Sequence, residues 1–205
     1  MKLQRFAVSF LLSRAKSVRL LGDEKRENKR FALGFPTSRD SERTERRGRM
    51  GDKQKHEPQI AREWLESLSR GETHELEALS LAGLQVEHAE RGLIRCKFIV
   101  PNHLSDGVGN WCTGAMALLI DDVGAAAICS AVGHIKVSVN FSVSFISTAK
   151  IQEEVDIEAK VTEHKGKLTL VVVEVKKEGS GEMVAFAKQW MASVSPEITN
   201  QPSKL

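Results

Sequence analysis

The sequence of 205 residues has no tyrosine, only three cysteines and five prolines, and aromatic residues make up 5% of it. The cysteines, Cys96, Cys112 and Cys129, are odd in number and have no CxxC spacing, which argues against a disulfide scaffold and a zinc site. We therefore expect reduced thiols and no metal. No uninterrupted apolar run approaches the roughly 20 residues that cross a bilayer, so no membrane span is expected. The apolar share of 41% and the charged share of 28% are those of a globular protein.

Charge is distributed unevenly along the chain. Residues 1–60 hold 16 lysines and arginines against 8 acids, whereas residues 61–205 hold 14 against 19. The acidic part contains no basic stripe with interleaved aromatics, so a nucleic-acid partner is not expected. We predict a basic, disordered or leader-like extension over 1–59, one folded domain over 60–195, and a tail over 196–205.

Both ends of the chain resemble targeting signals. Residues 1–22 contain five basic residues, no acid and an amphipathic spread of Phe and Leu, as in a mitochondrial or plastid transit peptide. Two other interpretations stay open, a neutral tail and a translation start at Met50. The chain ends in Ser203, Lys204 and Leu205, the tripeptide that the peroxisomal import receptor reads. Peroxisome is therefore the expected location, and mitochondrion the alternative if translation starts at Met1 and the leader is used.

Hydrophobic periodicity predicts helices and strands in the middle of the chain. Residues 61–70 place Trp64, Leu65 and Leu68 on one helical face. Strands are expected over 92–100, 135–145, 154–164, 168–177 and 183–191, with hairpin-sized gaps that imply antiparallel pairing. In 135–145 the odd-numbered apolar residues are expected to face the core, and the even-numbered ones to face away. The inward set is Ile135, Val137, Val139, Phe141, Val143 and Phe145, and the outward set is Lys136, Ser138, Asn140, Ser142 and Ser144.

Residues 113–132 are apolar on every helical face except for Asp121 and Asp122. Such a helix must be buried, and an antiparallel sheet can bury it by wrapping around it. An unpaired buried carboxylate is costly. Either both aspartates face solvent where the helix is uncovered, or one lies at a cleft as a general base or nucleophile.

The loop from Asp106 to Gly114 contains three glycines and leads into this helix. The first amides of a helix suit an anion or the oxyanion of a tetrahedral intermediate. An ordinary helix entry capped by Asn110 or Thr113 is the alternative. Thr113 and Asp121 are eight residues, about 12 Å, apart along a helix, too far to act on one carbonyl. If both are catalytic, they come from different subunits, which predicts a dimer.

Two further candidates have weaker support. Cys112 stands at the helix start, where a thiolate would be favoured, but no histidine lies near it in sequence to act as a base. Lys136, with Lys165 and Lys167, could contact the phosphates of a nucleotide. The alternative is that these lysines simply lie on solvent-exposed strand edges and turns.

Over about 92–191 the sequence resembles small hotdog thioesterases of the PaaI and acyl-coenzyme A thioesterase 13 type, especially plant members. Five stretches carry the resemblance: Gly109–Ala115, Leu118–Gly124, Val137–Phe141, Ser147–Lys150 and Phe186–Trp190. It implies an α+β hotdog fold, in which a five- to six-stranded antiparallel sheet wraps around one long central helix. It also implies hydrolysis of acyl-CoA to free acid and CoA without a cofactor, by a homodimer or a tetramer of two dimers.

The same resemblance assigns roles to residues. The family's helix carboxylate corresponds to Asp121, its serine on the following strand to Ser138, and its oxyanion amide to Thr113, followed by Gly114. Two positions depart from the family: its histidine at the helix start is Cys112, and the asparagine of the animal member is Asp106. Asp106 is therefore a candidate for ordering water.

The remaining substrate contacts are expected from Trp111, Cys112, Gly114, Asn110 and Lys136. The alternative function is a hotdog protein that binds acyl-CoA without hydrolysing it. A hydratase is disfavoured because Cys112 occupies the position that would supply its histidine.

Overall fold

The computed structural model describes residues 56–72 and 75–193. The leader-like segment 1–22, Met50 and the C-terminal Ser203, Lys204 and Leu205 lie outside the described residues. The elements follow in the order helix 56–69, α3 (Glu75–Leu81), β1 (Gln85–Glu90), β2 (Leu93–Ile99), a 3-10 turn η1 (Asn102–Leu104), α4 (Thr113–Val132), β3 (Val137–Phe145), β4 (Glu154–Lys165), β5 (Leu168–Lys177) and β6 (Met183–Ala192).

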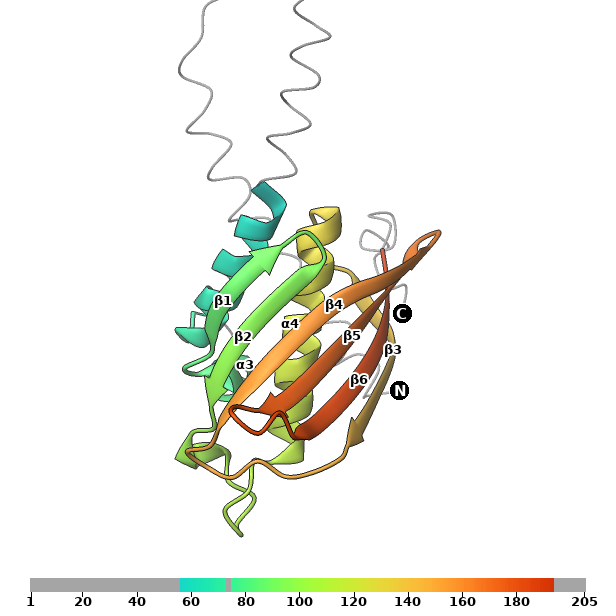
Figure 1. The fold of residues 1–205 in the computed structure, drawn as a ribbon. Coiled ribbons are helices and arrows are strands. Elements are labelled where there is room, and N and C mark those ends of the chain that lie inside the picture. The colour runs from blue at the N-terminus through green and yellow to red at the C-terminus, as the bar shows by residue number, and fades with distance from the viewer. Residues whose placement is uncertain (1–55, 73–74, 194–205) are drawn as a thin grey trace, which may run out of the picture.

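The six strands form one antiparallel sheet in the order β1-β2-β4-β5-β6-β3. Figure 1 shows this sheet curving around α4, with the helix 56–69 and α3 beside β1 at one end. The expected hotdog fold, an α+β sheet wrapped around one long helix, is confirmed. The sequence patterns missed β1 because Gln85–Glu90 holds only two apolar residues and does not alternate strongly. They also missed α3, which has only seven residues.

Helix α4 is the centre of the core. Thirteen of its twenty residues are buried, Asp122 among them. It ends at Gly133, whose left-handed backbone (φ 79°) lets its amide donate to the carbonyl of Cys129 at 2.8 Å. By length and composition α4 could cross a membrane, but 72% of an 18-residue stretch of this helix is buried inside the fold. Within the described part of the chain, α4 is the apolar helix around which the sheet wraps.

The inward faces of the strands complete the core as their alternation predicts. Ile94, Cys96 and Phe98 of β2 are buried, as are Val171, Val173 and Val175 of β5. From the N-terminal side, Trp64, Leu65 and Leu68 are buried on one helical face, as expected.

The alternation predicted for residues 135–145 is wrong in part. Ser138 lies opposite the buried Met191, and Phe141 lies opposite the buried Gln189, so both face α4 although their numbers differ in parity. The cause is a β-bulge between Ser138 and Asn140, because one extra residue exchanges the two faces of a strand. As a result Lys136 and Ser138 point inward, and Val139 is 56% exposed.

Strand β3 is also the edge of the sheet, which leaves apolar side chains uncovered. Phe141 and Phe145 lie on the inward side of the strand after the bulge, yet they are 38% and 45% exposed. Helix α4 does not extend over this edge far enough to cover them. An edge strand with an open apolar face is a surface on which a second chain can pack.

Candidate active site

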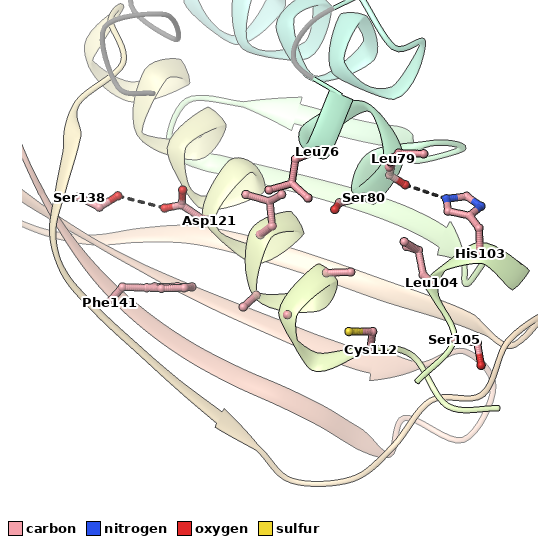
Figure 2. Close-up of a pocket in the computed structure, with 14 residues that line it drawn as sticks. Leu76, Leu79, Ser80, His103, Leu104, Ser105, Cys112, Asp121, Ser138 and Phe141 are labelled. Carbon is pink, nitrogen blue, oxygen red and sulfur yellow. Dashed lines mark hydrogen bonds between the residues drawn. The ribbon is translucent and has the colours of Figure 1, made fainter. Parts of the chain in front are cut away.

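A pocket of about 910 Å3 lies where α3, η1, α4 and β3 meet. Apolar side chains form most of its wall, and its polar or reactive groups include Asp121, Ser138 and Cys112 (Figure 2). The other residues that line it are Leu76, Leu79, Ser80, His103, Leu104, Ser105, Gly114, Ala115, Ala117, Leu118 and Phe141. An apolar pocket with a few convergent polar groups is the usual form of a small-molecule site.

Three side chains from three elements form a hydrogen-bonded group at one end of the pocket. The hydroxyl of Ser138 on β3 donates to Oδ1 of Asp121 on α4 at 3.0 Å. The side-chain amide of Gln189 on β6 donates to the same Oδ1 and, at 2.8 Å, to the hydroxyl of Ser138. The structure therefore brings together the two residues that the sequence paired, Asp121 and Ser138, and adds Gln189.

The two neighbouring aspartates have different surroundings. Asp122 is fully buried, whereas Asp121 is half-buried and lines the pocket. The interpretation in which both simply face solvent is wrong. Asp121 thus has the access that a general base or nucleophile needs.

The start of α4 offers backbone amides. Its N-cap residue is Cys112, which makes no side-chain capping bond, and the first helical bond runs from the amide of Met116 to the carbonyl of Cys112 at 3.0 Å. The amides of Thr113, Gly114 and Ala115 precede that bond and therefore have no acceptor within the helix. The alternative of a helix entry capped by Asn110 or Thr113 is wrong, because the N-cap position is Cys112. Gly114 and Cys112 line the pocket, but Thr113 does not.

Asp106 holds the loop before α4 together. Its Oδ1 accepts the amides of Val108 and Asn110, both at 3.0 Å, and its Oδ2 accepts the side-chain amide of Asn110 at 3.2 Å. These bonds, the backbone amide of Asn110 first, hold the pKa of Asp106 below its usual range. Asp106 and Asn110 are thus partners of each other, and the structure does not bring either to the pocket.

We expect Asp106→Asn to weaken the pH dependence of stability. A carboxyl whose pKa is lower in the folded chain stabilises the fold above its unfolded pKa, near 3.9, and loses that effect as pH falls through the folded value. The side-chain oxygen of asparagine can still accept the backbone amides of Val108 and Asn110, but asparagine does not titrate. Urea unfolding of wild type and variant between pH 7 and pH 2 should show the wild-type advantage shrinking in acid, and an advantage independent of pH would contradict this assignment.

Two other predicted substrate contacts lie away from the pocket. Trp111 is 2% exposed and packs in the core against Phe98, with ring centroids 5.2 Å apart. Lys136 is 5% exposed, and its ammonium donates to Thr169 Oγ1 at 2.6 Å and to the carbonyl of Lys167 at 3.2 Å. The pattern that turned Lys136 outward did not allow for the bulge. Burial lowers the pKa of Lys136 below that of an ordinary lysine.

This burial makes a testable contribution to stability at alkaline pH. Because the folded pKa of Lys136 is below the unfolded value, the unfolded chain binds more protons between the two values. The free energy of unfolding should therefore rise with pH across that window. Lys136→Met should remove this rise. The measurement is the difference in unfolding free energy between the wild type and Lys136→Met from pH 7 to pH 11. The two chains share every other lysine, so the difference reports on Lys136 alone. A difference that stays constant with pH would contradict a lowered pKa of Lys136.

The cysteines behave differently from one another. Cys96 and Cys129 are buried free thiols, and burial raises the pKa of each to about 12. Cys112 is half-buried and faces the pocket. Among the described residues no group of three or more His, Cys, Asp and Glu side chains could hold a metal ion.

Sequence reasoning missed Gln189 and the wall formed by α3. Gln189 belongs to the inward row of β6 with Ala185, Ala187 and Met191, and all four are fully buried. A glutamine in such a row was a usable signal, since a buried amide needs a partner. Leu76, Leu79 and Ser80 lie on a seven-residue helix whose short pattern gave no comparable indication.

Comparison with known proteins agrees with this architecture. Residues 109–184 match the model of the thioesterase superfamily. No curated protein sequence matches the chain. The match starts in the loop before α4 and ends in β6, so it contains the helix start, Asp121 and Ser138.

Solved structures share the fold at low sequence identity. Thioesterase superfamily member 2 from zebra fish is 20% identical with a TM-score of 0.62, and the alignment covers 67% of this chain and 98% of that one. A hypothetical thioesterase protein of Streptococcus pneumoniae, whose crystal structure contains coenzyme A, is 17% identical with a TM-score of 0.56, and the alignment covers 62% of this chain and 97% of that one. The PaaI protein of Escherichia coli is 14% identical with a TM-score of 0.52, covering 64% and 97%.

The resemblance to hotdog thioesterases that the sequence indicates is thus confirmed by the family match and by the fold. Residues 109–184 match the thioesterase superfamily, and the described residues have the hotdog architecture. At these identities the solved structures establish the fold alone.

Proposed function

We propose that the protein is an acyl-CoA thioesterase that hydrolyses an acyl-CoA to the free acid and CoA, with Asp121 as its catalytic carboxylate. The observation that carries the proposal is Asp121 itself, a half-buried carboxylate on the core helix that opens onto an apolar pocket and is hydrogen-bonded to Ser138. The match to the thioesterase superfamily and the coenzyme A held by the Streptococcus pneumoniae protein support it.

The chemistry follows from the position of these groups. Asp121 activates a water molecule or attacks the thioester carbonyl itself, and Ser138 holds the carboxylate and helps to order the water. The amide of Thr113, at the positive end of the α4 dipole, stabilises the oxyanion. CoA leaves as a thiolate. Because thiols have pKa values of about 8.5, the CoA sulfur needs little protonation in order to leave. This sequence of steps uses no cofactor.

The site needs a second copy of the chain. Thr113 and Asp121 lie on the same helix, about 12 Å apart along its axis, so they cannot reach one carbonyl together. In a two-fold dimer the helix start of one chain can face Asp121 of its partner, and the reverse contact follows by symmetry. The exposed apolar side chains of β3, Val139, Phe141 and Phe145, support packing of a second chain at that edge. A tetramer of two dimers stays a prediction.

The assay is release of free thiol from a panel of short, long, branched and aromatic acyl-CoAs by the full chain and by a chain that starts at Met50. We expect turnover of at least one acyl class. Binding of these thioesters without thiol release would instead make the protein an acyl-CoA binder, which the departures at Cys112 and Asp106 would explain.

We also propose a peroxisomal location, supported by Ser203, Lys204 and Leu205 at the C-terminus. A fluorescent protein fused to the N-terminus of the chain should enter peroxisomes, and removal of the tripeptide should leave it in the cytosol. Fusion at the C-terminus tests the alternative, because it blocks the tripeptide and exposes the leader of residues 1–22. Mitochondrial fluorescence would then show that the leader is used.

A further inference from the structure

We propose that Gln189 is a positioning residue for Asp121, and that Gly124 provides the space in which its amide can do so. This inference deepens the proposed thioesterase function and rests on it. The inference is based on the buried side-chain amide of Gln189, which donates hydrogen bonds to both the carboxylate of Asp121 and the hydroxyl of Ser138.

The first argument is the burial of Gln189. It is fully buried in an inward row whose other members are two alanines and a methionine. Its cross-strand neighbours are Phe141 on β3 and Val171 on β5. A glutamine in such apolar surroundings must satisfy its amide through particular partners.

The second argument is the direction of the amide. Its nitrogen serves Asp121 and Ser138, whereas its oxygen, Oε1, has no hydrogen-bond partner among the described residues. The amide therefore places its donor against both the carboxylate and the hydroxyl.

The third argument is that both donors meet the same carboxylate oxygen. Ser138 and Gln189 each donate to Oδ1 of Asp121, and Gln189 also donates to Ser138. The three groups form a closed triangle from three elements. Such a triangle fixes the torsion of the carboxylate, and with it the direction in which Oδ2 projects.

Gly124 explains how the amide fits against the helix. It lies three residues after Asp121 on α4, and a Cβ added there would stand 2.8 Å from Oε1 of Gln189. It would also contact Val171 and Val173 at 3.3 and 3.4 Å. Because Oε1 is the end of a flexible side chain, Gly124→Ala should displace the amide rather than the backbone.

The test uses Gln189→Met, which keeps the length of the side chain and removes the donor, and Gly124→Ala, which keeps the donor and removes its space. Both should lower kcat about 10–100-fold, with KM within about twofold of wild type, since the lost contact orients a reacting group. In the double variant Gly124→Ala should add little to the effect of Gln189→Met, because both act through one amide. The matched control is Ser130→Ala, which removes a buried hydrogen-bonded hydroxyl from α4 away from this group and should lower the melting temperature but not kcat.

A readout without substrate separates this inference from the proposed function. The 13C signal of the Asp121 carboxyl group, assigned with Asp121→Asn, should move in Gln189→Met and in Gly124→Ala but not in Ser130→Ala. If the wild type hydrolyses no thioester but the signal moves, the thioesterase proposal fails and the positioning role holds. If the signal stays in place, or if kcat is unchanged in a folded Gln189→Met protein, Gln189 supports only the fold and the inference is overturned.

Discussion

Replacing Asp121 with asparagine is expected to lower kcat for thioester hydrolysis by about 10²–10⁴-fold, the usual effect of removing a positioned general base. Asparagine has nearly the same shape and can still accept hydrogen bonds from Ser138 and Gln189, so the fold and the binding of acyl-CoA should persist. The measurement is thiol release at saturating acyl-CoA, together with the dissociation constant of the same thioester.

The matched control is Asp156→Asn, which makes the same chemical change at an exposed position of β4. Its rate should equal that of wild type. If Asp121→Asn and Asp156→Asn both turned over like wild type, the catalytic carboxylate would have to be sought elsewhere.

Removing the amide hydrogen of Thr113 should cost about 10²–10³-fold in kcat if that amide binds the oxyanion. Thr113 is the first residue of α4, a position where proline is tolerated because its missing N–H has no partner within the helix. Cys112 already has an extended ψ of 122°, as a residue before proline requires. Thr113→Pro therefore deletes one hydrogen-bond donor at little structural cost. Thr113→Ala keeps the amide and should retain the wild-type rate.

Mixing the two inactive variants tests whether the site is shared between subunits. In a mixed dimer of Asp121→Asn and Thr113→Pro chains, one site receives an intact carboxylate and an intact amide, and the other receives neither. With random exchange about half of the dimers are mixed, so about one quarter of the wild-type activity should return. If both groups came from the same subunit, the mixture would stay as inactive as its parts.

The sequence predicted the large elements because their patterns reflect burial directly. Helix α4 spans Thr113–Val132, as expected, because a run that is apolar on every face fits only a position inside the sheet. Strand β5 likewise has the predicted bounds, Leu168–Lys177, since it alternates between two turns that contain glycine. In both elements the local pattern and the tertiary position agree.

Strand β3 and the pocket were harder to predict because they depend on contacts between distant segments. A bulge adds one residue without any mark in the residue types, and it reversed the expected orientation of Lys136 and Ser138. The resemblance to known thioesterases still paired Ser138 with Asp121, whereas periodicity alone pointed Ser138 away. Gln189 was missed because its role becomes visible only when β6, β3 and α4 are seen together.

The measurement that tests the central claim most directly is a single turnover of bound acyl-CoA in water enriched in 18O. The panel described above first supplies the acyl group that binds most tightly. We predict that CoA is released as free thiol. The acid carries 18O if water attacks the acyl carbonyl, whereas Asp121 carries it if the carboxylate first forms an anhydride and water then attacks the aspartyl carbon. Recovery of the intact, unlabelled thioester from a folded and saturated protein would contradict the account and leave an acyl-CoA binder in its place.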